Sequence, residues 1–471
     1  MLKKNDIIRL EINDITNLGF GVGRHEGQIV FVSDAISGDV IDSRIIKVNK
    51  SYAIGRVEKY IEKSPLRHDG RCDISACKSC AYKSISYEHE LKLKEKTVRE
   101  AFAHEGLREV AIAPAVPSPE VVGYRNKAQY PIAIGKDGNY VIGFYAPKSH
   151  RVTEARHCPL APEIFGEILD TLATFFKKHS VSVYDEESGT GLLRHVYLRR
   201  GEISREVLLT LVINGDSIPC ERELVRIMNE RYPEIVGILL NTNTAATNVI
   251  LGNGWRTLFG RDYIFDTLGG VRLKITAPSF YQVNRAAADM LYAKARELAA
   301  PKSSDTVLDL FCGAGSIGLS MADKCGELIG IEIIDSAVKC ATENAAANDI
   351  KHAKFYTGDA KDTEKLLERA ERELGRTIRP DVVILDPPRA GCDARLVSFA
   401  ASLSPSRIVY ISCNPTTLAR DCRLFADLGY TPGTVTPFDL FPATGHVESV
   451  VCLKRQTRQL SSPAASEVAK Q

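Results

Sequence analysis

The sequence has little net charge and lacks long apolar runs. Its 61 lysine and arginine residues nearly balance its 59 aspartate and glutamate residues, which leaves a formal net charge of +2 at pH 7. So small a charge excludes attraction of nucleic acid by the whole surface, and any such contact must come from local patches. No apolar stretch reaches the length of a signal peptide's core or of a membrane span. We therefore expect a cytoplasmic protein with no membrane contact.

The chain does have enough apolar residues for several cores. Its 471 residues are 44% apolar, which excludes the collagen-like, low-complexity and disordered classes for most of the chain and suffices for two or three domains. It also has 12 cysteines. Because disulfides are rare in the cytoplasm, the spacing of these cysteines points to metal binding or catalysis.

The first two regions differ in pattern. Residues 1–62 contain short alternating runs such as QIVFVS and DVIDSRII, separated by glycine and aspartate turns. This pattern predicts a small antiparallel barrel of the oligonucleotide-binding type, with a structural barrel that binds nothing as the alternative. Residues 63–265 contain one amphipathic helical segment and several strand-like stretches. They predict an α+β domain whose purpose the pattern does not disclose.

The third region has a regular alternation. Residues 266–455 contain apolar runs such as TVLDLF, DVVILDPP and RIVYISC, separated by helical patterns. Apolar strands that alternate with helices predict a doubly wound parallel sheet, so the whole chain is expected to be a multidomain α/β protein. Residues 456–471 are rich in serine, alanine and proline, and we expect them to be disordered.

A glycine-rich turn follows the first strand of this sheet. The stretch DLFCGAGSIG carries Gly313, Gly315 and Gly318 in the G-x-G-x-x-G pattern. Such glycines let the backbone turn tightly and approach a nucleotide. Glu332 closes the next strand and is placed to bind both hydroxyls of a ribose. These features alone fit a dinucleotide and S-adenosylmethionine equally well.

The fourth strand of the sheet favours the second of these ligands. It ends in LDPPRAG, so that Asp386 is followed by two prolines that hold a rigid loop at the ligand-binding edge of the sheet. Together with the GDA stretch at residues 358–360, this favours a class I methyltransferase over a dehydrogenase. A purely structural role for the DPPR stretch is the third interpretation.

A cysteine stands where the next strand ends. Cys413 follows RIVYIS, and a helix that begins after Asn414-Pro415 is expected to favour its thiolate through the helix dipole. A methyltransferase needs such a thiolate when its target is carbon 5 of uracil, because addition to carbon 6 makes carbon 5 nucleophilic. A base must then remove the carbon 5 proton. Glu448, two residues after His446, is the candidate, unless it is only a solvated charge.

Five motifs in series resemble one family, the RNA uracil-5-methyltransferases that use S-adenosylmethionine. They are SFYQVN, DLFCGAGSIGL, LDPPRAG, YISCNPTTLARD and HVESVV. The chain resembles most the 23S ribosomal RNA members, which implies that residues 1–62 form an RNA-binding TRAM domain. The resemblance implies that Cys413 is the nucleophile and Glu448 the base. It also implies a set of cofactor contacts, namely Gln282, Phe311, Glu332, Asp359 and Asp386.

A second group of cysteines follows the barrel. Cys72, Cys77 and Cys80 have x4 and x2 spacing, and Cys158 is a distant fourth. Such a group holds zinc or iron and sulfur, and the spacing alone is similar to a plant-type two-iron site. The family resemblance implies a four-iron cluster on these four residues, although Lys78-Ser79 stand where many members have Gly-Gly. Methyl transfer through a thiolate needs no electron, so we expect a structural or RNA-contacting role for the cluster.

The expected partner is RNA, with the target uridine flipped out of its stack. The candidate contacts are Arg125, Gln129, Arg194, His195, Arg199 and Arg200, and no protein partner is evident. Large-subunit ribosomal RNA is favoured because the transfer RNA enzymes of the family look shorter and lack the barrel and the cysteines. Three alternatives stay open: a transfer RNA substrate, a nicotinamide oxidoreductase with an iron–sulfur centre, and an RNA-binding module without turnover.

Overall fold

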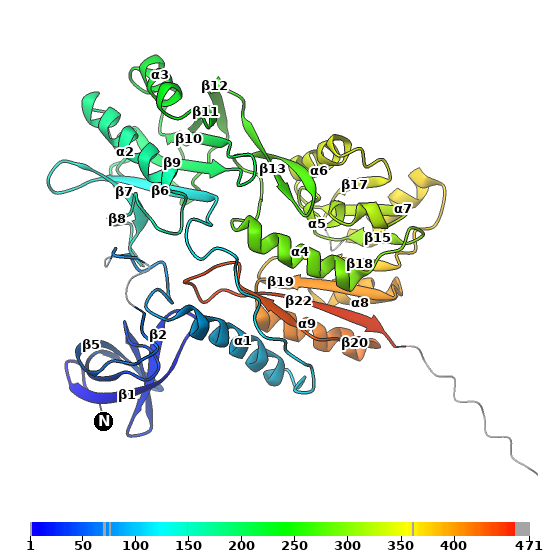
Figure 1. Cartoon of the computed structure of the whole chain (residues 1–471), viewed down its shortest axis with the longest axis horizontal. Coiled ribbons are helices and arrows are strands. Elements are labelled where there is room, and N and C mark those ends of the chain that lie inside the picture. The colour runs from blue at the N-terminus through cyan, green and yellow to red at the C-terminus, as the bar shows by residue number, and fades with distance from the viewer. Residues whose placement is uncertain (1, 69–71, 75–76, 148, 360–361, 457–471) are drawn as a thin grey trace, which may run out of the picture.

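The computed structural model describes residues 2–68, 72–74, 77–147, 149–359 and 362–456. Of the tail that the sequence predicts to be disordered, all but Gln456 lies outside the described residues. In the described part of the chain, no helix combines the length and the apolar character needed to cross a bilayer. Figure 1 shows the barrel, a central sheet and a C-terminal sheet with helices on both faces.

The N-terminal strands close into the predicted barrel, in the order β1-β2-β3-β5-β4. In β1 every second side chain is buried, as a half-buried strand requires. Leu10, Val30 and Ile41 fill the interior. The pairing departs from the expectation in one respect, because β3 and β5 run parallel. The strands are β1 (Ile7–Ile15), β2 (Phe20–His25), β3 (Gln28–Ser33), β4 (Val40–Val48) and β5 (Tyr52–Glu62).

The central region is built on one seven-stranded sheet, in the order β12-β11-β10-β9-β6-β7-β8. Helices α2 (Glu163–Lys178) and α3 (Glu221–Arg231) cover one face, where Phe165, Leu169 and Leu224 join its core. The strands are β6 (Lys127–Ile134), β7 (Tyr140–Tyr145), β8 (Val152–Glu154), β9 (Leu193–Arg200), β10 (Val207–Ile213), β11 (Ile235–Thr242) and β12 (Gly254–Gly260).

The C-terminal region is a doubly wound sheet in the order β17-β16-β15-β18-β19-β22-β20, with β21 paired to β22. The first five strands of this order run parallel, and β22 runs antiparallel to β19. The strands are β15 (Thr306–Asp309), β16 (Glu327–Glu332), β17 (Ala353–Thr357), β18 (Val382–Leu385), β19 (Arg407–Ser412), β20 (Tyr430–Pro432), β21 (Thr436–Phe438) and β22 (Glu448–Arg455).

Two apolar layers cover this sheet. One face packs against the hairpin of β13 (Tyr263–Leu268) and β14 (Val271–Thr276) and against α4 (Arg285–Ala299), α5 (Ser316–Leu319) and α6 (Asp335–Ala347). A short 3-10 helix, η1 (Ala322–Lys324), follows α5. The other face packs against α7 (Thr363–Leu374), α8 (Ala394–Ser402) and α9 (Pro415–Asp427). Both faces are therefore buried, as the continuous apolar strands predict.

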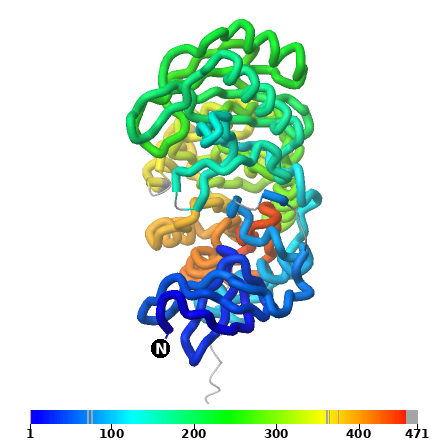
Figure 2. The backbone as a smooth tube through the Cα atoms, turned by 90° about the vertical axis from the view of Figure 1, so that its left-hand side faces the viewer, coloured from blue at the N-terminus to red at the C-terminus, as the bar shows by residue number. Residues whose placement is uncertain are grey.

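Helix α1 (Tyr87–His104) lies in the range predicted for the central domain but packs on the C-terminal sheet. Its Val98 and Phe102 share a core with Phe425 of α9, and Figure 1 shows α1 beside α9. An amphipathic pattern tells which side of a helix is buried but not which domain covers it. Figure 2 shows the consequence for the whole molecule: the barrel and the central sheet lie at opposite ends, with the C-terminal region between and behind them.

Candidate active site

The carboxyl ends of the parallel strands bring the predicted site residues to one edge of the sheet. Asp309, Glu332 and Leu385 end the strands β15, β16 and β18, and Asp386 follows directly. Ligands of doubly wound sheets bind at this edge. Phe311 and Asp386 line a narrow cavity here together with Phe280, Gly313 and Tyr292. Two of the five predicted cofactor residues therefore share one cavity wall.

Glu332 joins two loops of this edge. Its Oε2 accepts a hydrogen bond from the Gly313 amide at 3.1 Å, and its Oε1 accepts one from the Ile334 amide at 3.0 Å. Gly313 has a positive φ of 53°, which glycine adopts without strain and which turns its amide toward the carboxylate. The carboxylate therefore shapes the glycine-rich turn of the predicted cofactor site.

The other two predicted cofactor residues lie nearby. Gln282 is buried directly after Tyr281, which lines the same cavity. Asp359 follows the end of β17, where the Gly358 amide donates a hydrogen bond to the backbone oxygen of Glu332 at 2.9 Å. Four of the five predicted residues therefore lie at or just after the carboxyl ends of parallel strands, and Gln282 lies in the segment between β14 and α4.

Cys413 and Glu448 are neighbours across two strands. Ser412 of β19 pairs with Ser449 of β22, so the residue after Ser412 faces the residue before Ser449. Glu448 is buried, whereas Cys413 is only half-buried. His446 is exposed and lies edge-on to Phe441, with 5.9 Å between the ring centroids. The fold therefore brings together a thiol and a carboxylate that are 35 positions apart in the sequence.

Three carboxyl groups near this edge hold their protons unusually tightly, of which Asp309 and Glu448 are buried and Asp386 is half-buried. Burial raises the pKa of Asp386 to about 7, and Asp309 adds to the shift. Burial raises the pKa of Glu448 to about 8, Asp386 raises it further and Arg389 opposes the change. Burial raises the pKa of Asp309 to about 7 as well. A region of buried acids is well suited to receive a positively charged ligand.

The sequence predicts a thiolate at Cys413, but the surroundings of this thiol favour its neutral form. Burial raises its pKa, Glu448 and Asp386 raise it further, and Arg389 lowers it. The predicted help from the helix dipole is outweighed by burial and by these two carboxyl groups. In addition, Asn414 caps α9 with its own side chain, since its Oδ1 accepts a hydrogen bond from the Thr416 amide at 3.1 Å. The thiol is therefore neutral in the free protein.

The loop that carries Cys413 is tied to the DPPR loop. The Asn414 side chain donates a hydrogen bond to the backbone oxygen of Arg389 at 2.9 Å, and the Thr417 hydroxyl donates to the same oxygen at 3.3 Å. The Arg420 guanidinium donates to the backbone oxygens of Ala390 and Cys392. These bonds join the loop that carries the thiol to the loop that follows Asp386.

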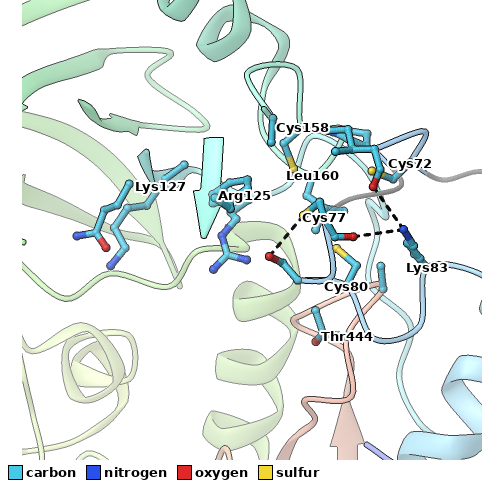
Figure 3. Close-up of a pocket in the computed structure, with 17 residues that line it drawn as sticks. Cys72, Cys77, Cys80, Lys83, Arg125, Lys127, Cys158, Leu160 and Thr444 are labelled. Carbon is cyan, nitrogen blue, oxygen red and sulfur yellow. Dashed lines mark hydrogen bonds between the residues drawn. The ribbon is translucent and has the colours of Figure 1, made fainter. Parts of the chain in front are cut away.

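The second cysteine group lines a separate cavity of about 280 Å³. Figure 3 shows the side chains of Cys72, Cys77, Cys80 and Cys158 converging on it. All four thiols are free of disulfides. Burial and the other three cysteines raise the pKa of Cys80 to about 12. Among the described residues, no three of these sulfur atoms form a group within 4.8 Å of one another.

The six predicted RNA contacts have different surroundings. Arg125 and Gln129 line the cysteine cavity, and Arg200 is half-buried. The prediction is wrong for Arg194, His195 and Arg199, because all three side chains are buried. Arg199 donates hydrogen bonds to the backbone oxygens of Thr276 and Ser279 at 3.0 and 2.7 Å. Burial was not visible in the sequence, where these cations interrupt an apolar strand.

The sequence analysis missed three residues at these sites. Arg389 lies within LDPPRAG and acts on the charges of Cys413 and Glu448. Asp309 begins the DLFCGAG stretch and accepts a hydrogen bond from the Gly318 amide at 3.2 Å. Lys127 lines the cysteine cavity, and burial together with Arg199 and Arg125 lowers its pKa to about 8. The first two belong to motifs that were already recognised, whereas no pattern marked Lys127.

Comparison with known families gives two matches along the chain. The model of the tRNA (Uracil-5-)-methyltransferase family matches residues 230–456. The model of the TRAM domain matches residues 2–57. Between them these matches cover the barrel and the C-terminal sheet.

Similar proteins cover almost the whole chain. An uncharacterized RNA methyltransferase of Halalkalibacterium halodurans is 36% identical over 455 residues, which are 96% of this chain and 98% of that protein. One of Clostridium acetobutylicum is 36% identical over 459 residues with the same coverage. Among solved structures, the tRNA (uracil-54, C5)-methyltransferase of Pyrococcus abyssi with S-adenosyl-L-homocysteine has a TM-score of 0.75 and 27% identity, and the match covers 95% of this chain and 100% of that one.

Proposed function

Because this chain belongs to the family of tRNA and rRNA (uracil-5-)-methyltransferases with a TRAM domain, we propose that it methylates carbon 5 of a uridine in 23S ribosomal RNA through a covalent Cys413 adduct. The family makes the chain an RNA methyltransferase with S-adenosylmethionine as methyl donor. The barrel is its TRAM domain, and the C-terminal sheet has the class I methyltransferase fold. The ribosomal substrate, the covalent step and the residue roles are the proposal.

The observation that carries the proposal is the pairing of Cys413 with Glu448 beside the cofactor edge. S-adenosylmethionine, when bound, supplies a methyl group on a positively charged sulfur. The Cys413 thiol first gives up its proton to solvent. The resulting thiolate sulfur forms a bond to carbon 6 of the uracil, and the electron pair of the 5,6 double bond moves toward carbon 5 and oxygen 4. Carbon 5 then takes the methyl group and becomes tetrahedral, while the bond from methyl to sulfur breaks with its electron pair left on the sulfur of S-adenosylhomocysteine.

Glu448 completes the reaction as a base. Its carboxylate takes the proton from carbon 5, the 5,6 double bond re-forms, and the Cys413 sulfur leaves with its electron pair. Its pKa of about 8 in the free protein suits a base that works near neutral pH. The positive charge of the bound methyl donor favours the ionised forms of Asp386 and Glu448 at the moment when they are needed.

The cysteine cavity suits an iron–sulfur cluster better than a zinc ion. A tetrahedral zinc site holds its sulfurs about 2.3 Å from the metal and hence about 3.8 Å from one another. Here no three of the four sulfurs, all in the described part of the chain, lie within 4.8 Å of one another. A cavity of about 280 Å³ separates them. We therefore assign Cys72, Cys77, Cys80 and Cys158 to a four-iron cluster.

Unpaired cations support an RNA path from this cavity to the catalytic residues. In the described part of the chain, neither Arg125 nor Lys127 forms an ion pair, and both line the cysteine cavity. Arg389 is exposed next to Cys413 and Glu448. Cations without carboxylate partners are free to bind phosphates. The proposed path for the backbone of the flipped uridine runs along these three side chains.

Transfer RNA is the second candidate substrate, and one observation favours it. The match to the Pyrococcus abyssi enzyme, a tRNA (uracil-54, C5)-methyltransferase, covers 95% of this chain. Length therefore does not separate the two substrates, contrary to the expectation that transfer RNA enzymes are shorter. Because so complete a match also includes most of the barrel, the barrel does not separate the two substrates either. Ribosomal RNA stays the proposal on the resemblance of the sequence to the 23S ribosomal RNA members of the family.

The test uses radiolabelled S-adenosylmethionine with unmodified 23S ribosomal RNA or transfer RNA, and compares the wild type with Cys413→Ala. We expect label as 5-methyluridine in the ribosomal RNA only, and none with the variant. A protein–RNA adduct that survives a denaturing gel is expected for the wild type alone. Label in transfer RNA alone would overturn the substrate, and label transferred by Cys413→Ala would overturn the covalent step.

A further inference from the structure

The loop between β21 and β22 forms part of both candidate sites. It runs from residue 439 to residue 447 and ends at Glu448, the first residue of β22. Ala443 and Thr444 of this loop line the cysteine cavity. The Ala443 side chain packs with Tyr124 and Leu160, and Cys80 and Cys158 pack against the same cluster. Four positions therefore separate the wall of the cysteine cavity from the proposed catalytic base.

A buried ion network fixes the start of this loop. Lys94 of α1 is 1% exposed, and its amine donates hydrogen bonds to Asp439 at 2.5 Å, to Glu90 at 2.8 Å and to the backbone oxygen of Phe441 at 3.1 Å. Glu90 in turn accepts a hydrogen bond from the Ala443 amide at 2.8 Å. Buried charges that satisfy one another in this way hold their carriers in one geometry.

The segment of residues 77–82, which carries Cys77 and Cys80 and is here called the cysteine segment, holds the middle of the loop. The Tyr82 amide, two residues after Cys80, donates a hydrogen bond to the backbone oxygen of Ala443 at 2.9 Å. The Tyr124 hydroxyl donates to the backbone oxygen of Pro442 at 3.0 Å. A displacement of the Cys80 segment would therefore pull directly on the loop.

Thr444 connects this fixed part to the residues that precede Glu448. Its hydroxyl donates a hydrogen bond to the backbone oxygen of Phe441 at 2.8 Å and accepts one from the His446 amide at 3.3 Å. The barrel leaves the following residue no room, because a Cβ on Gly445 would lie 2.0 Å from the backbone oxygen of Asn17. The loop is thus pressed between the barrel and the cysteine segment.

We propose that the loop of residues 439–447 couples the cysteine cavity to the catalytic base, and that Thr444 is the residue that positions Glu448. This inference rests on the proposed function. The filled cavity holds Cys80, Cys158 and the loop wall in place, and Thr444 passes this constraint through the His446 amide to Glu448. The step that depends on it is removal of the carbon 5 proton, which comes after bond formation by Cys413. The cluster thereby serves a reaction that transfers no electron.

The first test separates this step from methyl transfer. Ribosomal RNA with tritium at carbon 5 of uridine is mixed with methyl-labelled S-adenosylmethionine and the cluster-loaded protein. Thr444→Val keeps the shape of the side chain but removes both hydrogen bonds, Thr444→Ser keeps them, and Thr434→Val alters an exposed threonine 10 positions earlier. Release of tritium reports proton removal, and a gel-stable adduct reports the state before it.

In the wild type and in Thr434→Val, tritium release should match methyl incorporation. In Thr444→Val we expect near-normal methyl incorporation, tritium release slowed about tenfold, and accumulation of the methylated adduct. Thr444→Ser should restore the wild-type ratio. Equal tritium and methyl rates in Thr444→Val, whether normal or both reduced, would overturn the positioning role. Failure of the wild type to methylate would instead overturn the proposed function.

A second test follows the loop itself. Hydrogen exchange of the segment 443–448 is compared between the cluster-loaded protein and Cys158→Ser, with the β10 segment 207–213 as internal reference. We expect faster exchange of the His446 amide when the cavity is no longer filled, because its acceptor on Thr444 is released. Unchanged exchange of this segment in a Cys158→Ser protein that has lost its iron would overturn the coupling.

Discussion

At the scale of single residues, the site is governed by the cost of burying charge. Glu448 is buried and Asp386 is half-buried, and burial is the largest cause of the raised pKa of each. The same cause keeps the Cys413 thiol neutral in the free protein, although its position before a helix suggested a thiolate. The proposed mechanism therefore relies on the charge that the cofactor brings, and not on the helix dipole, to activate the thiol and the base.

A pH profile tests this view of Glu448. Because its pKa is raised to about 8, the base is protonated below that pH, and the stage that needs its carboxylate is slow there. We expect the rate of tritium release from carbon 5 of the methylated adduct, which reports the stage after attack by Cys413, to rise about tenfold per pH unit up to pH 8 and to level off above it. Glu448→Gln should lose methyl turnover and retain a stable protein–RNA adduct. A flat profile between pH 6 and pH 9 would contradict the assignment.

Lys127 allows a test of the RNA path at the same scale. Burial lowers the pKa of its amine to about 8, with Arg199 and Arg125 adding to the shift, so a phosphate there would favour the charged form. Lys127→Gln should weaken RNA binding about tenfold and lower the slope of log affinity against log salt by about one. Lys136→Gln, an exposed lysine after the same strand, is the matched control. Equal effects of the two variants in a filter-binding titration would argue against a specific phosphate contact.

At the scale of elements, the buried side chain of Arg199 connects the central sheet to the cofactor edge. Arg199 of β9 reaches the turn after β14 and binds the backbone oxygens of Thr276 and Ser279. The residues that follow this turn, Phe280 and Tyr281, line the cofactor cavity. Arg199 is 0% exposed, so its charge has no access to RNA. Its position indicates a role in shaping the cofactor site.

Substitution of Arg199 should therefore weaken cofactor binding. Arg199→Lys keeps the charge but cannot bridge both carbonyl oxygens, and one buried acceptor left without a donor costs about 2 kcal/mol. We expect a lower free energy of unfolding and weaker binding of S-adenosylhomocysteine by calorimetry. Arg222→Lys, at an exposed position of α3, is the control. Unchanged calorimetric affinity in a less stable variant would mean that the turn is not part of the cofactor site.

The barrel and helix α1 show which features of an element a local sequence pattern predicts and which it does not. The alternation in residues 1–62 predicted the barrel, which is confirmed, because a period of two reports one buried face of each strand. The parallel pairing of β3 with β5 was not foreseen, since pairing partners depend on contacts between distant segments. For the same reason the amphipathic pattern of α1 did not reveal that its Lys94 joins Asp439, 345 positions away.

At the scale of the whole molecule, three regions meet around the loop before β22. The barrel contributes Asn17, the cysteine segment contributes Tyr82, and helix α1 contributes Lys94. Each of these contacts joins segments hundreds of positions apart in the sequence. The proposed cluster thus stands where the domains join, and its loss should be felt as a loss of stability.

Cys80→Ser tests this role. Removal of one ligand should lower the iron content and reduce the unfolding temperature by about 5 °C, because metal binding contributes to the free energy of folding. Cys220→Ser, at an exposed cysteine of the central region, should leave both unchanged. Affinity for S-adenosylhomocysteine should be retained, since the cofactor cavity is lined by other residues. A Cys80→Ser protein without iron but with full thermal stability would contradict the structural role.

The sequence by itself determined the order of the domains, the chemistry at the carboxyl edge and the candidates Cys413 and Glu448, because strand period, glycine turns and motif spacing are local properties. Only the tertiary structure decided which charged groups are buried, and hence that Arg199 supports a turn and that the Cys413 thiol is neutral. It also decided that one loop forms part of both sites. Burial and long-range contact depend on the packing of distant segments, which no local pattern encodes.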